Sequence, residues 1–81
     1  MLMASDPHHG FSTLSNRERQ VAALIALGHP NKYIGHKLGI TEGTVKAHAH
    51  AIFQKLGVRT RYELASKFAA LQAFHRGGKH N

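Results

Sequence analysis

The chain contains no cysteine and only four acidic residues among its 81. Without cysteine it forms neither a disulfide nor a thiolate metal site, and it offers no thiol nucleophile. Four acids without an acid–base cluster leave little to catalyse with, so we expect no enzyme, no catalytic residue and no cofactor. No apolar run approaches the ~18–20 residues of a membrane span, and residues 1–3 are too short for an apolar leader. We therefore expect a cytoplasmic protein without a membrane partner.

The charges that are present are mostly positive. Eleven lysines and arginines give a net charge of +7 with histidine neutral, and eight histidines are available to add to it in acid. A small basic domain suits a polyanion such as DNA, RNA or an anionic membrane surface. Charge alone does not separate these partners from a surface that is merely well solvated, so the choice depends on where the charges fall.

Capping residues, glycines and apolar spacing predict an all-α fold, a four-helix bundle that contains a helix-turn-helix. Ser15 with Glu18 and Thr60 with Glu63 have the S/T-x-x-E spacing of capping boxes, which satisfy open N–H groups of a first turn. Glycines follow the apolar stripes, where they end helices. The predicted helices span residues 15–27, 31–38, 42–56 and 61–74. The turn at residues 39–41 is short enough for a helix-turn-helix.

Composition divides the chain into one domain and two flanking segments. Residues 1–12 lack an apolar period and are interpreted as a flexible lead-in or the remnant of a linker. Residues 13–75 hold all four predicted helices and form the domain, and a length of 81 residues allows no second one. Residues 76–81 include two glycines and are predicted to be a disordered tail.

The third predicted helix has one apolar side and one narrow polar side. At about 100° per residue its buried stripe consists of Val45, Ala49, Ile52 and Leu56. The opposite side carries Gly43, Ala47, His50 and Gln54, flanked by Lys46. A B-DNA major groove admits one helix. The small side chain of Ala47 allows deep entry, and Lys46 and His50 can reach base edges or phosphates.

Two histidines lie two residues apart on this helix. Residues at i and i+2 do not share a helix face, so His48 and His50 are poor joint ligands and we expect no metal site. His48 is predicted at the edge of the buried stripe. Two interpretations remain open for it: a half-buried imidazole bonded to a carbonyl, and a phosphate contact from the edge of the groove.

The pattern as a whole resembles the LuxR-type, or GerE-type, helix-turn-helix over residues 13–75. The residues that carry the resemblance are LSNRER at 14–19, Gly28, NKxI at 31–34, Leu38, IT at 40–41, TVKxH at 44–48, Ile52, KLGV at 55–58 and Arg61. The resemblance implies a four-helix domain that binds double-stranded DNA and regulates transcription. Most members are C-terminal effector domains of response regulators or signal receptors, and some are small stand-alone regulators.

The resemblance also implies roles for individual residues. Positions matching Lys46, Ala47 and His50 face the bases, with the third helix in the major groove. Positions matching Asn31, Lys32, Thr44 and His48 lie near the DNA backbone. Lys32 opposes the dipole of its own helix unless a phosphate lies nearby, which favours that role. At the start of the fourth helix either Arg59 or Arg61 is expected to reach phosphate, and Arg61 carries the resemblance.

The fourth predicted helix has two apolar sides. One side is needed for packing on the other helices, and the second side consists of Tyr62, Ala65, Ala69 and Ala73. A monomer has no need of the second side, so we expect a homodimer. The resemblance agrees, since family members pair through this helix on an inverted repeat. Small apolar residues are also exposed by chance in monomers.

Departures from the family keep a second function open. The family usually has Ser or Thr where Pro30 stands, and often a longer basic side chain where His50 stands. A histidine there is expected to bind DNA more weakly or with a greater dependence on pH. The alternative is a protein-interaction module that contacts the transcription machinery, such as RNA polymerase, and binds DNA only weakly and without sequence preference.

Overall fold

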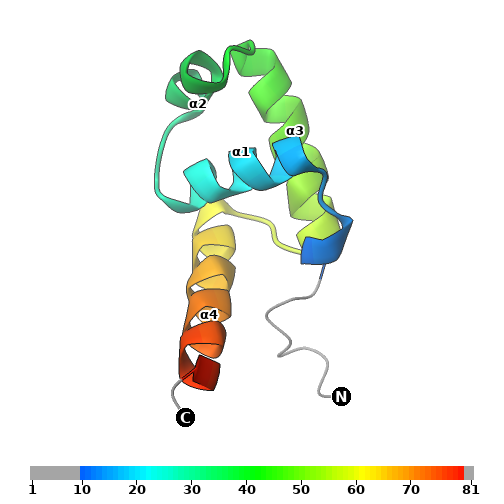
Figure 1. The fold of residues 1–81 in the computed structure, drawn as a ribbon. Helices are drawn as coiled ribbons and strands as arrows, with labels where there is room; N and C mark the ends of the chain where they lie inside the picture. The colour runs from blue at the N-terminus through cyan, green and yellow to red at the C-terminus, as the bar shows by residue number, and fades with distance from the viewer. Residues whose placement is uncertain (1–9, 80–81) are drawn as a thin grey trace.

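Four α-helices and one 3-10 turn make up the computed structural model (Figure 1), which describes residues 10–79 and the side chains of residues 10–73. The elements in chain order are η2 (Phe11–Thr13), α1 (Asn16–Ala26), α2 (Asn31–Leu38), α3 (Glu42–Leu56) and α4 (Arg61–Lys79). No strand occurs within residues 10–79, which confirms the all-α prediction. In this range no helix is both long and apolar enough to cross a bilayer.

Local capping sets where α1 and α4 begin. The Ser15 hydroxyl accepts from the Glu18 N–H at 3.1 Å, and the Glu18 carboxylate accepts from the Ser15 N–H at 2.9 Å, which confirms the first capping box. At α4 the Thr60 hydroxyl accepts from the Glu63 N–H at 3.1 Å. The Glu63 carboxylate, however, bonds the N–H of Arg59 and not that of Thr60. The second predicted box is therefore only half formed.

The helix-turn-helix is held tight by glycine. Gly39 and Gly57 end α2 and α3 with φ of 71° and 69°, the left-handed region that a residue without Cβ enters easily. Gly35 is buried, and a Cβ on it would lie 2.7 Å from the Ile40 carbonyl oxygen. The Ile40 N–H donates to the Gly35 carbonyl at 2.9 Å. The turn thus folds directly onto α2 where a side chain would stand.

α1 lies across the molecule and contacts α2, α3 and α4 (Figure 1). Its inward residues meet those of the other helices in one core. The buried apolar residues are Leu14, Val21, Ala22, Ile25, Ile34, Val45, Ile52, Leu56 and Leu64. Since every helix contributes to this core, the orientation of α2 and α3 is set by α1 and by the start of α4.

Structured residues lie beyond the predicted domain boundaries at both ends of the described range. The Phe11 ring packs edge-on against Phe68, with centroids 5.2 Å apart, so residues before the predicted domain start at 13 also contact the helices. α4 continues to Lys79, past the predicted end at 74, and residues 76–79 are helical where a disordered tail was predicted. Gly77 and Gly78 lower helix propensity by about 1 kcal/mol each but do not forbid a helix. Residues 1–9 and 80–81 lie outside the described residues.

Candidate nucleic-acid interface

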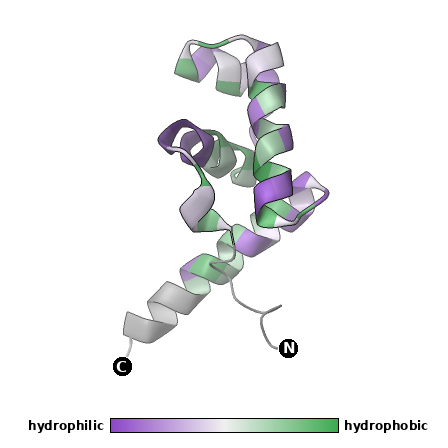
Figure 2. Cartoon of the chain, turned by 90° about the vertical axis from the view of Figure 1, so that its right-hand side faces the viewer, coloured by the Kyte–Doolittle hydropathy of each residue, from purple (hydrophilic) through white to green (hydrophobic). Residues whose placement is uncertain are grey.

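The two sides of α3 differ as the sequence predicts. Val45, Ile52 and Leu56 are buried, and Ala49 is half-buried against the same core. The exposed side is formed by Gly43, Thr44, Lys46, Ala47, His50 and Gln54. Apolar and polar patches accordingly alternate along α3 (Figure 2). After Glu42 in the first turn this helix carries no acid, so its outer side is neutral to positive.

The three residues predicted to face bases have no polar partner in the described part of the chain. Lys46, Ala47 and His50 are exposed, and within residues 10–79 their side chains make no hydrogen bond or ion pair. Side chains without internal partners keep their donors available to an external ligand. Lys46 and His50 lie one turn apart on the same side of α3, and the small Ala47 lies next to them.

Gly43 lies at the start of the same side, and packing does not explain it. A Cβ added there would meet only the Thr41 hydroxyl, at an ordinary 3.9 Å. Glycine within a helix costs roughly 0.5–1 kcal/mol relative to alanine. The protein itself therefore gains nothing from the missing side chain, while an external surface could come closer to this backbone.

Thr44 and His48 border the exposed side of α3. The Thr44 N–H donates to the Thr41 hydroxyl at 3.0 Å, and the two hydroxyls are 2.9 Å apart, so Thr44 is engaged in capping its own helix while remaining exposed. His48 is half-buried, and its ring makes no hydrogen bond to a carbonyl in the described part of the chain. His50 is exposed, so the two histidines have different surroundings.

The start of α2 holds the other predicted backbone contacts. Lys32 is exposed, whereas Asn31 is half-buried. Arg61, at the start of α4, is also half-buried and donates to the Asn31 Oδ1 and, at 3.3 Å, to the His29 carbonyl. Two residues predicted to bind the DNA backbone, Asn31 and Arg61, are thus bonded to each other. They line a groove of about 530 Å³ with Lys32 and Tyr62.

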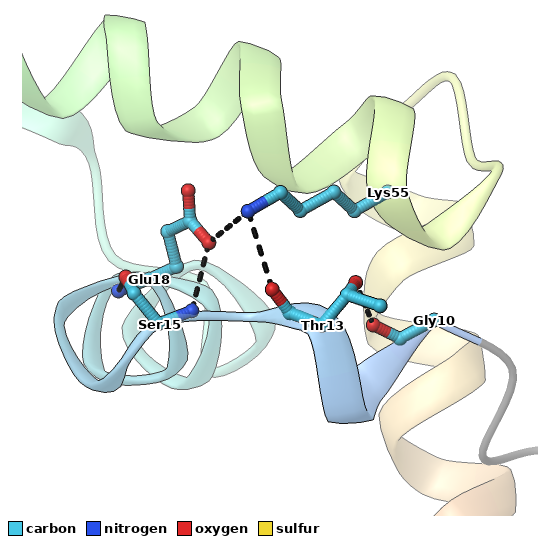
Figure 3. Close-up of polar contacts among 5 residues, drawn as sticks. All are labelled: Gly10, Thr13, Ser15, Glu18 and Lys55. Atoms are coloured by element: carbon cyan, nitrogen blue, oxygen red, sulfur yellow. Dashed lines mark hydrogen bonds and ion pairs between the residues drawn. The ribbon is translucent and has the colours of Figure 1, made fainter.

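Sequence reasoning missed one ion pair that fixes α3. The Lys55 Nζ lies 2.8 Å from the Glu18 Oε1 and 3.2 Å from the Thr13 carbonyl oxygen (Figure 3). Two hydrogen bonds lower the pKa of Glu18: the one from Lys55 has the larger effect, and the one from the Ser15 N–H the next. The pair joins residues 37 positions apart, so no local sequence pattern predicts it. It binds the last turn of α3 to the first turn of α1.

The predicted dimer residues lie on the outer side of α4. Tyr62 is 87% exposed, Ala69 and Ala73 are exposed, and Ala65 is half-buried. Sequence reasoning missed Leu27, which follows α1 and is 73% exposed. The apolar groove between α1 and α4, about 300 Å³, is lined by Ala23, Ala26, Leu27, Ala65, Phe68, Ala69 and Gln72. These residues carry no formal charge, so an uncharged surface continues from α4 onto α1.

Comparison with known proteins gives a consistent family. The model of the luxR family of bacterial regulatory proteins (GerE) matches residues 12–68. The nitrate/nitrite response regulator protein NarL of Escherichia coli is 46% identical over 52 residues, which are 64% of this chain and 24% of NarL. The oxygen regulatory protein NreC of Staphylococcus aureus is 45% identical over 60 residues, 74% of this chain and 26% of NreC.

A solved structure agrees with these relatives. The response regulator StyR superposes with a TM-score of 0.74 and 44% identity, over 78% of this chain and 32% of the StyR chain. The chain spans about a quarter of the length of the curated relatives named above. The matched part includes α1, α2, α3 and the start of α4, which are the elements that build the exposed side of α3 and the groove beside α2.

Proposed function

Since the chain belongs to the luxR family of bacterial regulatory proteins and is a DNA-binding helix-turn-helix domain of a transcription regulator, we propose that it reads duplex DNA by placing α3 in the major groove. The observation that carries this proposal is the exposed side of α3, which is narrow and free of acid after Glu42. Within residues 10–79, the side chains of its Lys46, Ala47 and His50 make no hydrogen bond or ion pair. Similarity to NarL, NreC and StyR supports the role of an effector domain of a response regulator.

Base contacts are assigned to Lys46, Ala47 and His50. Lysine donates to the guanine O6 and N7 acceptors, and histidine offers a ring N–H to an acceptor in the groove. Ala47 beside them has only a methyl group, which permits a close approach and apolar contact with a thymine methyl. The three exposed positions support this assignment because none of them is needed inside the protein.

Backbone contacts are assigned to the first turns of α2 and α3. Lys32 is exposed beside the open N–H groups of α2, and helix N-termini bind phosphate readily. Asn31 keeps its amide N–H₂ available while its oxygen accepts from Arg61. Thr44 and His48 border the base-facing residues and complete the set. Arg61 lies beside them, but two of its guanidinium donors already have protein acceptors.

We further propose that two copies bind an inverted repeat through α4. The exposed Tyr62, Ala69 and Ala73 and the half-buried Ala65 form the contact, and the exposed Leu27 extends it onto α1. An uncharged contact suits two copies that each carry a net charge of +7, because it adds no repulsion between them. The proposed location is the bacterial cytoplasm, with RNA polymerase as a further partner once the dimer is on DNA.

Selection of bound duplexes from a random pool, followed by sequencing, tests the proposal. We expect one enriched inverted repeat, and a slope of about −0.9 in log affinity against log salt for each phosphate contact. Enrichment of no sequence, with weak binding at all salt concentrations, would support the alternative of a protein-interaction module. In that case capture of RNA polymerase by the immobilised domain is the next measurement.

A further inference from the structure

The start of α2 lacks the cap that the other helices have. Ser15 and Thr41 cap α1 and α3 through their hydroxyls, but Pro30 occupies the corresponding position at α2 and makes no side-chain cap bond. The N–H groups of the first turn have no acceptor inside a helix. The first backbone bond of α2 runs from the Ile34 N–H to the Pro30 carbonyl at 3.1 Å. The turn before it needs support from elsewhere.

Arg61 supplies that support from α4. One guanidinium nitrogen donates to the His29 carbonyl at 3.3 Å, and the other donates to the Asn31 Oδ1. The two acceptors lie on either side of Pro30 in the sequence. A planar guanidinium with a fixed fork of donors holds two such acceptors in one geometry, whereas a lysine ammonium does not. Arg61 is half-buried, so these bonds are partly shielded from water.

The charges around this turn favour an anion outside the protein. Lys32, Arg61 and His29 line the groove together, with Glu42 as its one acid. The N-terminal end of α2 adds the positive pole of a helix dipole, which cations destabilise and anions stabilise. Two of the five guanidinium donors of Arg61 already have protein acceptors, whereas Lys32 and the open N–H groups of α2 have none within residues 10–79, so they are the more available donors for a phosphate.

We propose that Arg61 is a positioning residue for DNA binding. By donating to the His29 carbonyl and the Asn31 Oδ1 it fixes the turn before α2, a helix start without a hydroxyl cap. It thereby orients Lys32 and the first-turn N–H groups of α2, which it leaves open, toward a backbone phosphate. This inference rests on the proposed function, since it names the residue that sets one of its phosphate contacts. Arg61 then acts on the phosphate contact indirectly, through the orientation of α2, and not by touching the phosphate itself as expected from the sequence.

Charge-conserving substitution separates the two roles. Arg61→Lys keeps the charge but not the two-acceptor geometry, so we expect affinity for duplex DNA to fall about tenfold, nearly as far as in Arg61→Gln. A direct phosphate contact would survive in Arg61→Lys, because lysine binds phosphate well. Arg17→Lys and Arg17→Gln, at an exposed position of α1, are the matched controls. Near-wild-type binding by Arg61→Lys would overturn the proposal.

Restoring a hydroxyl cap gives an independent test. Pro30→Ser places an N-cap acceptor at α2, and we expect it to recover most of the affinity that Arg61→Lys loses while changing wild-type binding little. Pro30→Ser should thus raise DNA affinity more in the Arg61→Lys background than in the wild type. Such a difference is expected when Pro30 and Arg61 affect the same turn. An equal gain in both backgrounds would mean that the residues act separately and would refute positioning. Circular dichroism at the assay temperature confirms that the compared variants are folded.

A measurement without DNA keeps this inference separate from the proposed function. Hydrogen exchange of the Ile34 amide in the free protein reports the stability of the first turn of α2. Arg61→Lys is expected to speed this exchange about tenfold, and Pro30→Ser to reverse the change. If the wild-type protein binds no duplex DNA, the proposed function fails. The exchange rate of the Ile34 amide then still tests whether the bonds from Arg61 to His29 and Asn31 stabilise the first turn of α2. Unchanged exchange in Arg61→Lys would show that Arg61 does not hold α2.

Discussion

Lys55 and Glu18 form an ion pair, with the Lys55 Nζ 2.8 Å from the Glu18 Oε1. Lys55 lies in the last turn of α3, nine residues after Lys46, yet the two lysines have different surroundings. Lys46 has no partner within residues 10–79, whereas Lys55 also donates to the Thr13 carbonyl. α3 therefore leaves Lys46 exposed and unpaired in the described part of the chain, while its last turn is anchored to α1.

The ion pair predicts a stability loss in acid. The lowered pKa of Glu18 means that its contribution is present above the usual value of 4.5 and is lost as pH falls through the lower folded value. We expect the free energy of unfolding to drop by roughly 1 kcal/mol more on acidification in wild type than in Glu18→Gln, which keeps an acceptor for the Ser15 N–H. Urea unfolding between pH 7 and pH 3 measures this difference. Parallel pH profiles for the two proteins would argue against it.

Gly43 predicts opposite effects on folding and binding. Gly43→Ala is expected to raise the free energy of unfolding by roughly 0.5–1 kcal/mol, because the added Cβ has open space and improves helix propensity. The same methyl group should weaken DNA binding by about 1–3 kcal/mol if the backbone of α3 approaches DNA closely here. Denaturation and fluorescence-anisotropy titration measure the two effects. A variant that is more stable and binds as well as wild type would place Gly43 away from DNA.

Gly35 provides the contrasting control for that variant. A Cβ at Gly35 would lie 2.7 Å from the Ile40 carbonyl oxygen, so Gly35→Ala must displace the turn of the helix-turn-helix. We expect a loss of about 1–3 kcal/mol in the free energy of unfolding. Thermal unfolding of Gly35→Ala beside Gly43→Ala checks this contrast. Equal stability of the two variants would mean that the turn adjusts without cost.

Leu27 predicts an effect on pairing without an effect on the monomer. Its side chain is 73% exposed, so Leu27→Ser should change monomer stability by no more than about 0.5 kcal/mol. If the surface is covered by a second copy, binding to a duplex with two half-sites should weaken about tenfold, while binding to a single half-site stays unchanged. Gln20→Ser, at an exposed position of α1, is the control. Equal binding of both variants to the full site would exclude Leu27 from the dimer.

Local signals predicted the parts of the fold that local chemistry determines. Ser15 and Thr41 cap their helices, Gly39 and Gly57 end theirs, and the predicted bounds of α2 and α3 agree with the structure. The exposed side of α3 follows from helical geometry alone. The predicted end of α4 at residue 74 was wrong, because two glycines are a weak stop signal when no proline follows them.

Long-range contacts were beyond the reach of sequence patterns. The bonds from Lys55 to Glu18 and from Arg61 to Asn31 join residues 37 and 30 positions apart, and only the packed arrangement of α1, α3 and α4 brings them together. The resemblance identified the positions of Asn31 and Arg61 without indicating that they bond each other. Leu27 was predicted to be the last residue of the first helix, whereas α1 ends at Ala26 and the Leu27 side chain is exposed to solvent.

The most direct test of base reading by α3 is a repeated duplex selection with Lys46→Ala beside Arg17→Ala. Both variants lose one positive charge from an exposed helix position, but only Lys46 lies on α3. We predict that Lys46→Ala binds the wild-type site about 1–3 kcal/mol more weakly and enriches a site with relaxed preference at one position of each half-site. Arg17→Ala should enrich the wild-type site. Identical enriched sites and equal affinities for the two variants would contradict base reading by Lys46 on α3.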